Sequence, residues 1–213
     1  RLKIDKLLKT IYSNNTTEEI NFISNQLLQI LDDFSEKSAY EEISNKERWN
    51  ESHSVLITYA DSIYKKGEAT LITLRDLLSN YFGSLSKVVH ILPFLKSTSD
   101  GGFAVSSYET LEEKFGGWND LKSISKNHDL MADLVLNHVS SSHPWVQEFI
   151  KSQEPGISNV FSPDQNLDWS NVVRPRSSSL FSQINTEDGP KQVWTTFGPD
   201  QIDLNWHNPK MTL

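Results

Sequence analysis

The sequence contains no cysteine among its 213 residues. That absence excludes disulfide bonds, a thiolate nucleophile and every zinc site built on cysteine ligands. Cysteine-free chains fit a reducing compartment, so we expect a cytoplasmic protein.

Positive charge is scarce relative to negative charge: 20 Lys and Arg residues face 28 Asp and Glu residues, a net charge of −8. Binding to nucleic-acid phosphates needs clustered basic residues, so we expect no nucleic-acid partner. Long apolar runs are absent too. The run VVHILPFL is far too short to cross a bilayer, and the N-terminal segment RLKIDKLLKT lacks the apolar centre of a signal peptide. We therefore expect no membrane partner.

The composition that remains is that of a globular protein, with 37% hydrophobic and 23% charged residues. The sequence begins at Arg1 rather than at a methionine, and it stops at Leu213 without a closing signal. We expect it to be a fragment of a longer protein. It does not specify an oligomeric state.

Residues 1 to about 50 have a helical pattern. Thr16 followed by Glu19 fits a capping box at the start of a helix. An apolar stripe with spacings of three or four residues follows. Its members are Ile20, Ile23, Leu27, Ile30, Leu31 and Phe34.

From residue 55 the pattern alternates between strands and helices. Strands are predicted at VLITY (55–59), KVVHIL (87–92) and LMADLVL (130–136). Helices are predicted between them, at 73–83 with Gly83 as the stop and at 118–128 with Asn119 as the N-cap. This order predicts an α/β protein with a parallel sheet covered on both faces. After Ser140 the pattern becomes irregular, apart from a helical piece near WVQEFIKS.

Two α/β architectures fit this order, a doubly wound sheet and a (β/α)8 barrel. A doubly wound nucleotide-binding sheet needs a glycine-rich turn after its first strand, and the ADSIYKKGEA that follows Tyr59 has none. In a barrel, functional residues follow the carboxyl ends of the strands and share one face. Asp61, Asp100 and the pair Asn137-His138 occupy such places. The barrel is favoured.

Several polar clusters could carry chemistry, each with a structural alternative. His138 could serve a site or cap a loop, and a metal pair with His143 would lack the third ligand that zinc requires. Asp100, before two glycines, could accept sugar hydroxyls, and Phe103 and Tyr108 could stack on a sugar ring; otherwise this is a turn with core aromatics.

Two later segments are less decisive. Arg174 and Arg176 could hold a phosphate or carboxylate, although most arginine pairs form surface ion pairs. The segment VWTTFGPDQIDLNWHNP (193–209) could be a sugar-facing wall or a polar strand end, and its residues alone do not decide.

Together these segments resemble glycoside hydrolase family 13, the α-amylase family. DLVLNH looks like the family's first signature region at the end of barrel strand three, and QIDLN looks like the extra region before strand four. The segments LITYADSI, VVHILPF, SDGGF, FGGWNDL, RPR and VWTTFGPDQIDLN resemble the branch that contains the sucrose and glucosylglycerate phosphorylases, with the helical extension closer to the glucosylglycerate type.

The resemblance implies roles for particular residues. Asp100 and His138 match positions that bind hydroxyls of the transferred glucose, and Phe103 matches an aromatic residue near that subsite. Phe197 and Gln201 match the border of the acceptor subsite. These expectations come from the family and not from the spacing of the residues.

The resemblance also implies which residues handle phosphate and whether a metal ion is bound. Arg176 matches an arginine that handles phosphate in sucrose phosphorylases. Asn137 matches a calcium ligand of calcium-binding α-amylases, but the phosphorylase branch does not generally use that calcium. The resemblance thus implies no cofactor and no metal, with inorganic phosphate as co-substrate.

The sequence departs from the family at three places. Ala104-Val105 stands where sucrose phosphorylases tend to have Asp-Pro, and Ser177 where many have Pro, which puts the acceptor in doubt. The R-x-D nucleophile and the acid/base Glu are expected beyond Leu213, so no catalytic residue is assigned in this chain. Asp61, Asp133 and Asp203 are not promoted to replace them, and Asp133 is expected to be structural.

We therefore predict the N-terminal part of a retaining glucoside phosphorylase on a partial (β/α)8 barrel. It would transfer glucose from glucosylglycerate or sucrose to phosphate, giving α-glucose 1-phosphate; its partners would be the glucoside and phosphate. The expected parts are a helical extension (1–53), the first three barrel strands (54–140) and an insertion leading to strand four (141–213). The alternatives are a hydrolase or transglucosylase of the family and a non-catalytic barrel relative.

Overall fold

The computed structural model describes residues 2–37, 53–83, 85–164, 166–173 and 176–213. The chain forms two compact units: Arg1–Arg48 with Asn205–Leu213, and Trp49–Leu204. The predicted boundaries at 53 and 140 stay predictions. Arg174 lies outside the described residues, as do residues 38–52 of the predicted helical region.

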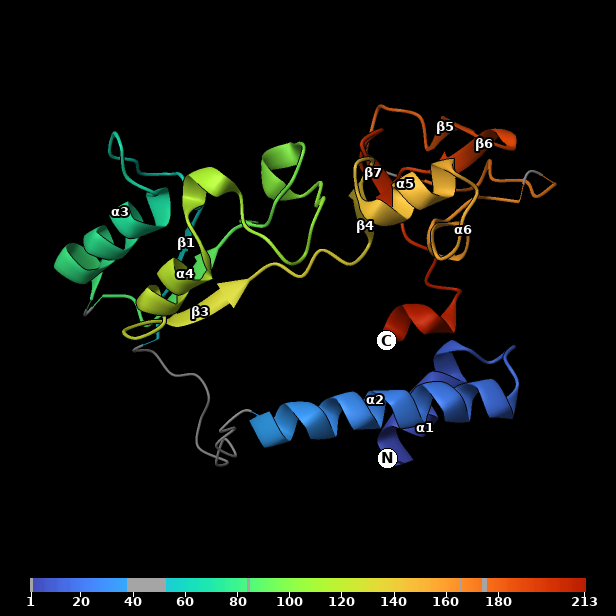
Figure 1. Ribbon diagram of the computed structural model, residues 1–213, viewed down its shortest axis with the longest axis horizontal. Helices are drawn as coiled ribbons and strands as arrows, with labels where there is room; N and C mark the ends of the chain where they lie inside the picture. Colours follow the sequence, from blue (N-terminus) through green and yellow to red (C-terminus); the bar gives the residue numbers. More distant parts are fainter. Residues whose placement is uncertain (1, 38–52, 84, 165, 174–175) are drawn as a thin grey trace. The chain divides into compact units, whose positions relative to one another are not determined.

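The first unit is a pair of helices with a short turn. Helices α1 (Leu2–Ile11) and α2 (Thr17–Lys37) are accompanied by η4, a 3-10 helix at Pro209–Thr212 (Figure 1). The capping box is confirmed, because the Thr16 amide donates to Glu19 at 2.9 Å and the Glu19 amide donates to the Thr16 hydroxyl at 3.2 Å. Only the first part of the apolar stripe is buried. Ile20 and Ile23 pack with Leu8 of α1 and with Tyr12, which directly follows α1, while Ile30, Leu31 and Phe34 are exposed.

The second unit contains a parallel sheet in the order β1-β2-β3, formed by Val55–Thr58, Val88–Ile91 and Asp129–Ala132. The connections carry α3 (Thr70–Leu77), which continues as the π-helical turn η1 (Leu78–Phe82), and α4 (Trp118–Ile124). Gly83 caps η1, as predicted. Helix α4 begins at Trp118, as predicted, but its N-cap is Gly117 rather than Asn119, because the Asp120 carboxylate accepts the Gly117 amide at 2.8 Å.

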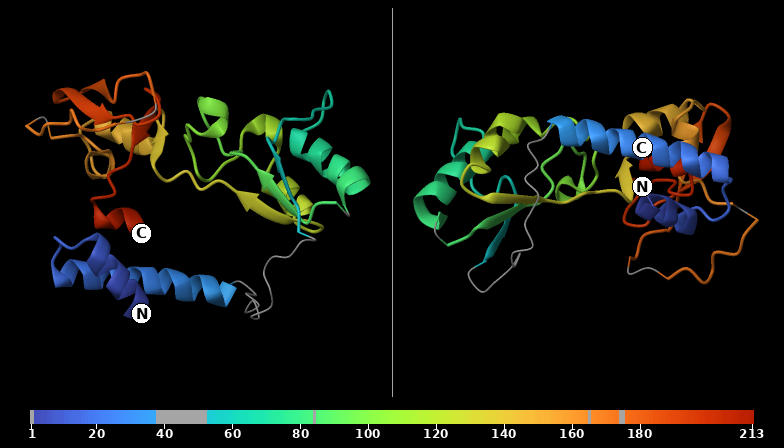
Figure 2. Two further views of the ribbon diagram at one scale, coloured as in Figure 1. Left: turned by 180° about the vertical axis from the view of Figure 1, so that it is seen from behind. Right: turned by 90° about the horizontal axis from the view of Figure 1, so that it is seen from below.

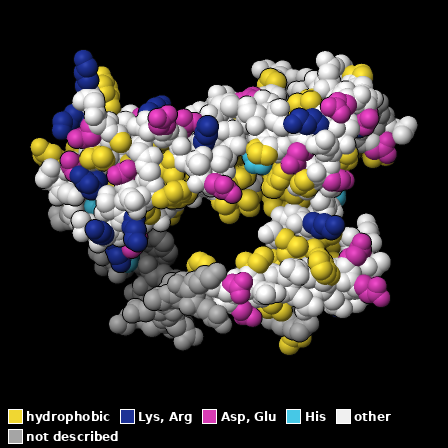
Figure 3. Space-filling view, viewed as in Figure 1, with side chains coloured by type: hydrophobic (Ala, Val, Ile, Leu, Met, Phe, Trp, Pro, Cys, Tyr) yellow, Lys and Arg dark blue, Asp and Glu magenta, His cyan; other side chains and the backbone are white. Residues whose placement is uncertain are grey.

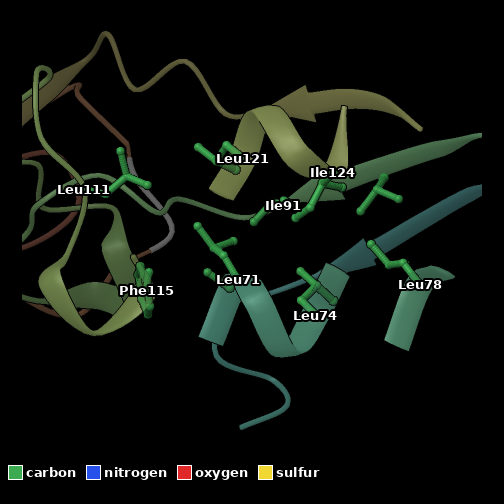
Figure 4. Packing of buried hydrophobic residues seen from close by; sticks show 10 residues of the cluster. Leu71, Leu74, Leu78, Ile91, Leu111, Phe115, Leu121 and Ile124 are labelled. Carbon is green, nitrogen blue, oxygen red and sulfur yellow. The ribbon is translucent and has the colours of Figure 1, made fainter. Parts of the chain in front are cut away.

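Both described crossover helices pack on the same face of this sheet. Figure 4 shows Leu71 and Leu74 of α3 directed toward Ile91 of β2, with Leu121 and Ile124 of α4 on the same cluster. Side chains alternate along a strand, so Ile57 and His90 belong to the opposite face, where the Ile57 side chain is 61% exposed. Within the described residues the second face is not covered by a helix, contrary to the expectation of cover on both faces. Sequential parallel strands with helices on one side form a barrel wall.

The third predicted strand (130–136) is shorter in the structure, and a strand that was not predicted follows it. Strand β3 ends at Ala132, and His138–Ser140 form a separate strand, β4, antiparallel to β7 (Gln201–Asp203). The backbone between them bonds elsewhere, with the Val135 carbonyl accepting the Tyr108 hydroxyl at 2.6 Å. The polar pair at 137–138 therefore begins a new ladder instead of ending the parallel strand.

The segment after Ser140 is more ordered than its sequence suggested. Helix α5 (Pro144–Ile150) confirms the predicted helical piece, and α6 (Gly156–Asn159) follows. A hairpin of β5 (Phe181–Thr186) and β6 (Gly189–Trp194) was not predicted (Figure 2). The Trp194 ring makes edge contacts with Trp169 and Phe181 at 5.1 Å, so half-buried aromatic rings join the hairpin to the loop before it.

The surface mixes both signs of charge. On the face drawn in Figure 3, acidic and basic side chains are interspersed, and hydrophobic side chains also reach the surface. Of the helices described here, none combines the length and hydrophobicity required to traverse a membrane.

Candidate functional site

One cavity of about 440 Å³ brings together side chains from five parts of the second unit. It is lined by Tyr59, Asp100, Gly101, Phe103, His138, Arg176, Phe197 and Gln201. All six residues that the sequence nominated for substrate binding are in that set. The cavity is within the size range of small-molecule sites.

The Asp100 turn presents a carboxylate to the cavity through an unusual backbone. The φ angle is 55° at Asp100, 61° at Gly101 and 107° at Gly102. A Cβ atom on Gly102 would lie 2.3 Å from the Pro93 carbonyl oxygen, so no side chain fits there. Asp tolerates the left-handed region better than most residues, yet the conformation is still strained, and such strain clusters at functional sites.

His138, the first residue of β4, is buried and lines the cavity. Its Nε2 lies 3.0 Å from the Phe103 carbonyl oxygen, and its Nδ1 lies 3.4 Å from the Asn137 amide nitrogen. A carbonyl accepts and an amide NH2 donates, so these neighbours favour the tautomer with the proton on Nε2. Burial lowers the pKa of His138, although the Phe103 carbonyl and the carboxylates of Asp203 and Asp100 oppose that shift. We therefore assign a neutral imidazole at pH 7.

Gln201 lies between the Asp100 carboxylate and the His138 imidazole. Its Nε2 donates to the Asp100 carboxylate at 2.8 Å and lies 3.1 Å from His138 Nε2. With the proton on His138 Nε2, the Nε2 atoms of His138 and Gln201 are both hydrogen-bond donors, so they cannot form a hydrogen bond with each other. A ligand hydroxyl could accept from one N–H group and donate its proton to Asp100. The cluster is suited to a polyhydroxylated ligand.

An aromatic and cationic wall borders the cavity. The Phe197 ring lies 5.0 Å from the His138 ring, and the Arg176 guanidinium carbon lies 5.6 Å from the Phe197 ring centre. Cation–π contact holds the guanidinium at the cavity mouth, where its N–H donors remain suited to an anion. Tyr59 also lines the cavity and packs closely on the Asp100 turn. A Cβ atom on Gly101 would lie 3.4 Å from the Tyr59 ring.

Two aromatic candidates lie outside this cavity. Tyr108 was considered for sugar stacking, but its hydroxyl donates to the Val135 carbonyl and burial raises its pKa to about 12. His143 caps α5 by accepting the Trp145 amide at 3.2 Å, and burial lowers its pKa to about 4. Both have structural roles in the described part of the chain.

The other aspartates considered have partners of their own. Asp61 pairs with Lys114 at 2.8 Å, and Asp133 pairs with His90 at 2.9 Å. Asp203 is buried and accepts the Thr196 amide at 3.1 Å and its hydroxyl at 2.5 Å. Burial raises the pKa of Asp203, and hydrogen bonds from Thr196 and Asn137 oppose that shift. Among the described residues that line the cavity, Asp100 is the one carboxylate.

Sequence reasoning missed Tyr59, which lines the cavity, and Asp200, which bonds to the residues just before Asp100. Tyr59 had a signal, its place at the carboxyl end of β1. Asp200 had none beyond its position before Gln201, yet its carboxylate accepts hydroxyls from Thr98 at 2.5 Å and Ser99 at 2.6 Å. Its contacts span about half of the chain and are invisible in a local pattern.

Comparisons with known proteins place this architecture. Residues 80–212 match the family model described as "Alpha amylase, catalytic domain". A glucosylglycerate phosphorylase of Allomeiothermus silvanus is 43% identical over 165 residues, which is 78% of this chain and 30% of the relative. A sucrose phosphorylase of Streptococcus mutans is 31% identical over 163 residues, 71% of this chain and 33% of the relative.

A solved structure shows the same arrangement. The crystal structure of a sucrose 6F-phosphate phosphorylase from Thermoanaerobacter thermosaccharolyticum superimposes with a TM-score of 0.65 at 34% identity, covering 75% of this chain and 35% of that one. The sheet β1-β2-β3 with its helices is thus the first part of a (β/α)8 barrel, as the sequence predicted. The chain spans about a third of the length of these relatives.

Proposed function

Because this chain belongs to the family of α-amylase catalytic domains, we propose that it is the N-terminal part of a retaining glucoside phosphorylase. The observation that carries the proposal is the convergence of Asp100, His138 and Gln201 in one cavity, bordered by Phe197 and Arg176. The likeness to phosphorylases of glucosylglycerate and sucrose supports the reaction type.

The proposed reaction breaks the bond between C1 of the glucosyl group and the glycosidic oxygen. A carboxylate beyond Leu213 attacks C1 and forms a β-linked glucosyl ester, while a second carboxyl group there protonates the leaving oxygen. A phosphate oxygen then attacks C1, the ester bond breaks, and α-glucose 1-phosphate leaves. No metal or other cofactor takes part in this scheme, and inorganic phosphate is the co-substrate.

The residues of this chain bind and orient in that scheme. Asp100 and His138 hold hydroxyls of the glucosyl group, with interactions that strengthen as the ring gains positive charge in the transition state. Phe103 packs beside the sugar. The acceptor and the phosphate enter past Phe197 and Gln201, and Arg176 provides a fork of N–H donors for phosphate oxygens.

The parts of the chain follow from the same proposal. Residues 1–53 are a helical extension, 54–140 open the barrel and 141–213 form an insertion before strand four. The isolated chain is inactive, because the two reacting carboxylates lie elsewhere in the protein. The absence of cysteine is consistent with a cytoplasmic enzyme, which fractionation of cells that produce it would test.

The test uses the full-length protein that contains this chain, supplied with glucosylglycerate or sucrose, with and without phosphate. Formation of α-glucose 1-phosphate that depends on phosphate supports the proposal. Turnover at equal rate without phosphate would instead identify a hydrolase or transglucosylase. Asp100→Asn should abolish most of the turnover, whereas the matched control Asp188→Asn, an exposed aspartate paired with Lys191 on the β5–β6 turn, should retain it.

A further inference from the structure

We propose that Asp200 is a positioning residue that fastens the Asp100 turn onto the strand carrying Gln201. This inference rests on the proposed function, since it assigns Asp100 to glucoside binding. Asp200 is not among the residues that line the cavity, so its effect would pass through its neighbours.

The hydrogen bonds of Asp200 converge from two separate parts of the fold. One carboxylate oxygen accepts the hydroxyls of Thr98 and Ser99, which directly precede Asp100. The other accepts the amide and hydroxyl of Ser141, which follows β4. A single carboxylate therefore joins the loop after β2, the end of β4 and the start of β7.

These bonds favour an ionised carboxylate at this place. Burial by itself raises the pKa of Asp200, but the hydroxyls of Ser141, Ser99 and Thr98 and the Ser141 amide together bring it below its usual value. Hydrogen bonds to an ionised acceptor are stronger than neutral ones. Thr98 also lies 2.6 Å from the Ser140 hydroxyl, so the hydroxyls form one network around the charge.

The hydrogen bonds to Asp200 hold the backbone next to the strained Asp100 turn. Asp100 has a φ angle of 55°, which costs free energy unless the surroundings hold it. Ser99 and Asp200 are each adjacent in sequence to one partner of the bond between Asp100 and Gln201. Loss of the Asp200 charge would let the turn relax and move the Asp100 carboxylate away from Gln201.

The experiment compares Asp200→Asn with wild type in the full-length protein, with Asp188→Asn as control. Asparagine has nearly the same shape but loses the charge and one acceptor oxygen. We expect kcat/KM for the glucoside to fall on the order of 10- to 100-fold, with kcat for the bound glucoside falling as well. The control should stay within about twofold of wild type.

A double-mutant cycle with Asp100→Asn separates positioning from a general structural effect. If Asp200 acts through Asp100, Asp200→Asn should have little further effect in the Asp100→Asn background. Equal losses of kcat/KM in both backgrounds would overturn the proposal. If Asp200→Asn does not fold, the pair Thr98→Val and Ser99→Ala removes two of the donors and should give the same fall and the same dependence on Asp100.

Amide hydrogen exchange tests the role of Asp200 independently of the proposed function, because it measures the stability of the Asp100 turn and not catalysis. The amides of residues 102–104 donate within the turn, to Ser99 and Asp100 carbonyls at 3.1 to 3.3 Å. They should exchange on the order of tenfold faster in Asp200→Asn, whatever reaction the protein catalyses. Unchanged exchange in the variant would overturn the role of Asp200, while inactivity of the wild type toward glucosides would overturn only the proposed function.

Discussion

Replacing Gly102 with alanine tests how closely the Asp100 turn approaches the end of β2. Alanine at this position meets two separate obstacles. The φ angle of 107° lies where L-residues are strained, and the new Cβ would lie 2.3 Å from the Pro93 carbonyl oxygen. That neighbour is backbone, so it cannot yield by rotating a side chain.

Gly189 provides a matched control for the first obstacle. It also has a φ angle of 107°, as the first residue of β6, but nothing lies within 4 Å of its Cβ position. Both alanine variants should lose about 1–3 kcal/mol from backbone strain. Gly102→Ala should lose roughly 1–3 kcal/mol more, the usual cost of overpacking a rigid site.

The assay is denaturant unfolding of the full-length protein and both variants, with the affinity for glucose measured alongside. We expect Gly102→Ala to unfold at lower denaturant than Gly189→Ala and to bind glucose more weakly, because the Asp100 carboxylate shifts with the turn. Gly189→Ala should bind glucose as wild type does. Equal loss of stability in the two variants would refute the close approach to Pro93.

Three further predictions follow from other parts of the chain. Acidification from pH 6.5 to about 4 should reduce the stability of the fold, because His143 binds its proton near pH 4 in the folded protein but near pH 6.5 in the unfolded chain. The variant His143→Asn can still cap α5 and should show a flatter dependence of the melting temperature on pH. An unchanged pH profile in this variant would contradict the prediction. Thr16→Ala should cost about 0.5–2 kcal/mol of helix stability and speed amide exchange in the first turn of α2, whereas Thr10→Ala on the exposed side of α1 should not. Arg176→Lys should raise KM for phosphate on the order of tenfold, because lysine lacks the fork of N–H donors. The control Arg75→Lys, which alters an exposed ion pair with Asp76, should leave KM for phosphate unchanged in the same rate assay.

Local features of the fold could be predicted from the sequence because their causes lie within a few residues. The capping box of Thr16 and Glu19 and the glycines after Asp100 are examples, since each follows from backbone requirements of a single turn. The alternation of apolar strands and helices also located β1, β2, α3 and α4. The N-cap of α4 differed by two residues from the predicted Asn119, because the Asp120 carboxylate accepts the Gly117 amide.

The six site residues were nominated through a family resemblance, and their own spacing left the structural alternatives open. Asp100 and Gln201 are 101 residues apart in sequence, and nothing local to either indicates the 2.8 Å bond between them. Tyr108 shows the opposite error: an aromatic residue near the motif suggested stacking, but its hydroxyl is needed to satisfy the Val135 carbonyl.

The sequence by itself determined the α/β class, the helical start and the chemical types available to a site, since composition and periodicity control which elements can form. Only the tertiary structure decided that Asn137-His138 opens the antiparallel pair β4–β7 instead of ending β3, and that Asp200 joins three segments. A strand exists through its hydrogen-bonded partner, and a site exists through side chains held at fixed distances. Both depend on contacts between residues far apart in the chain, which no local pattern encodes.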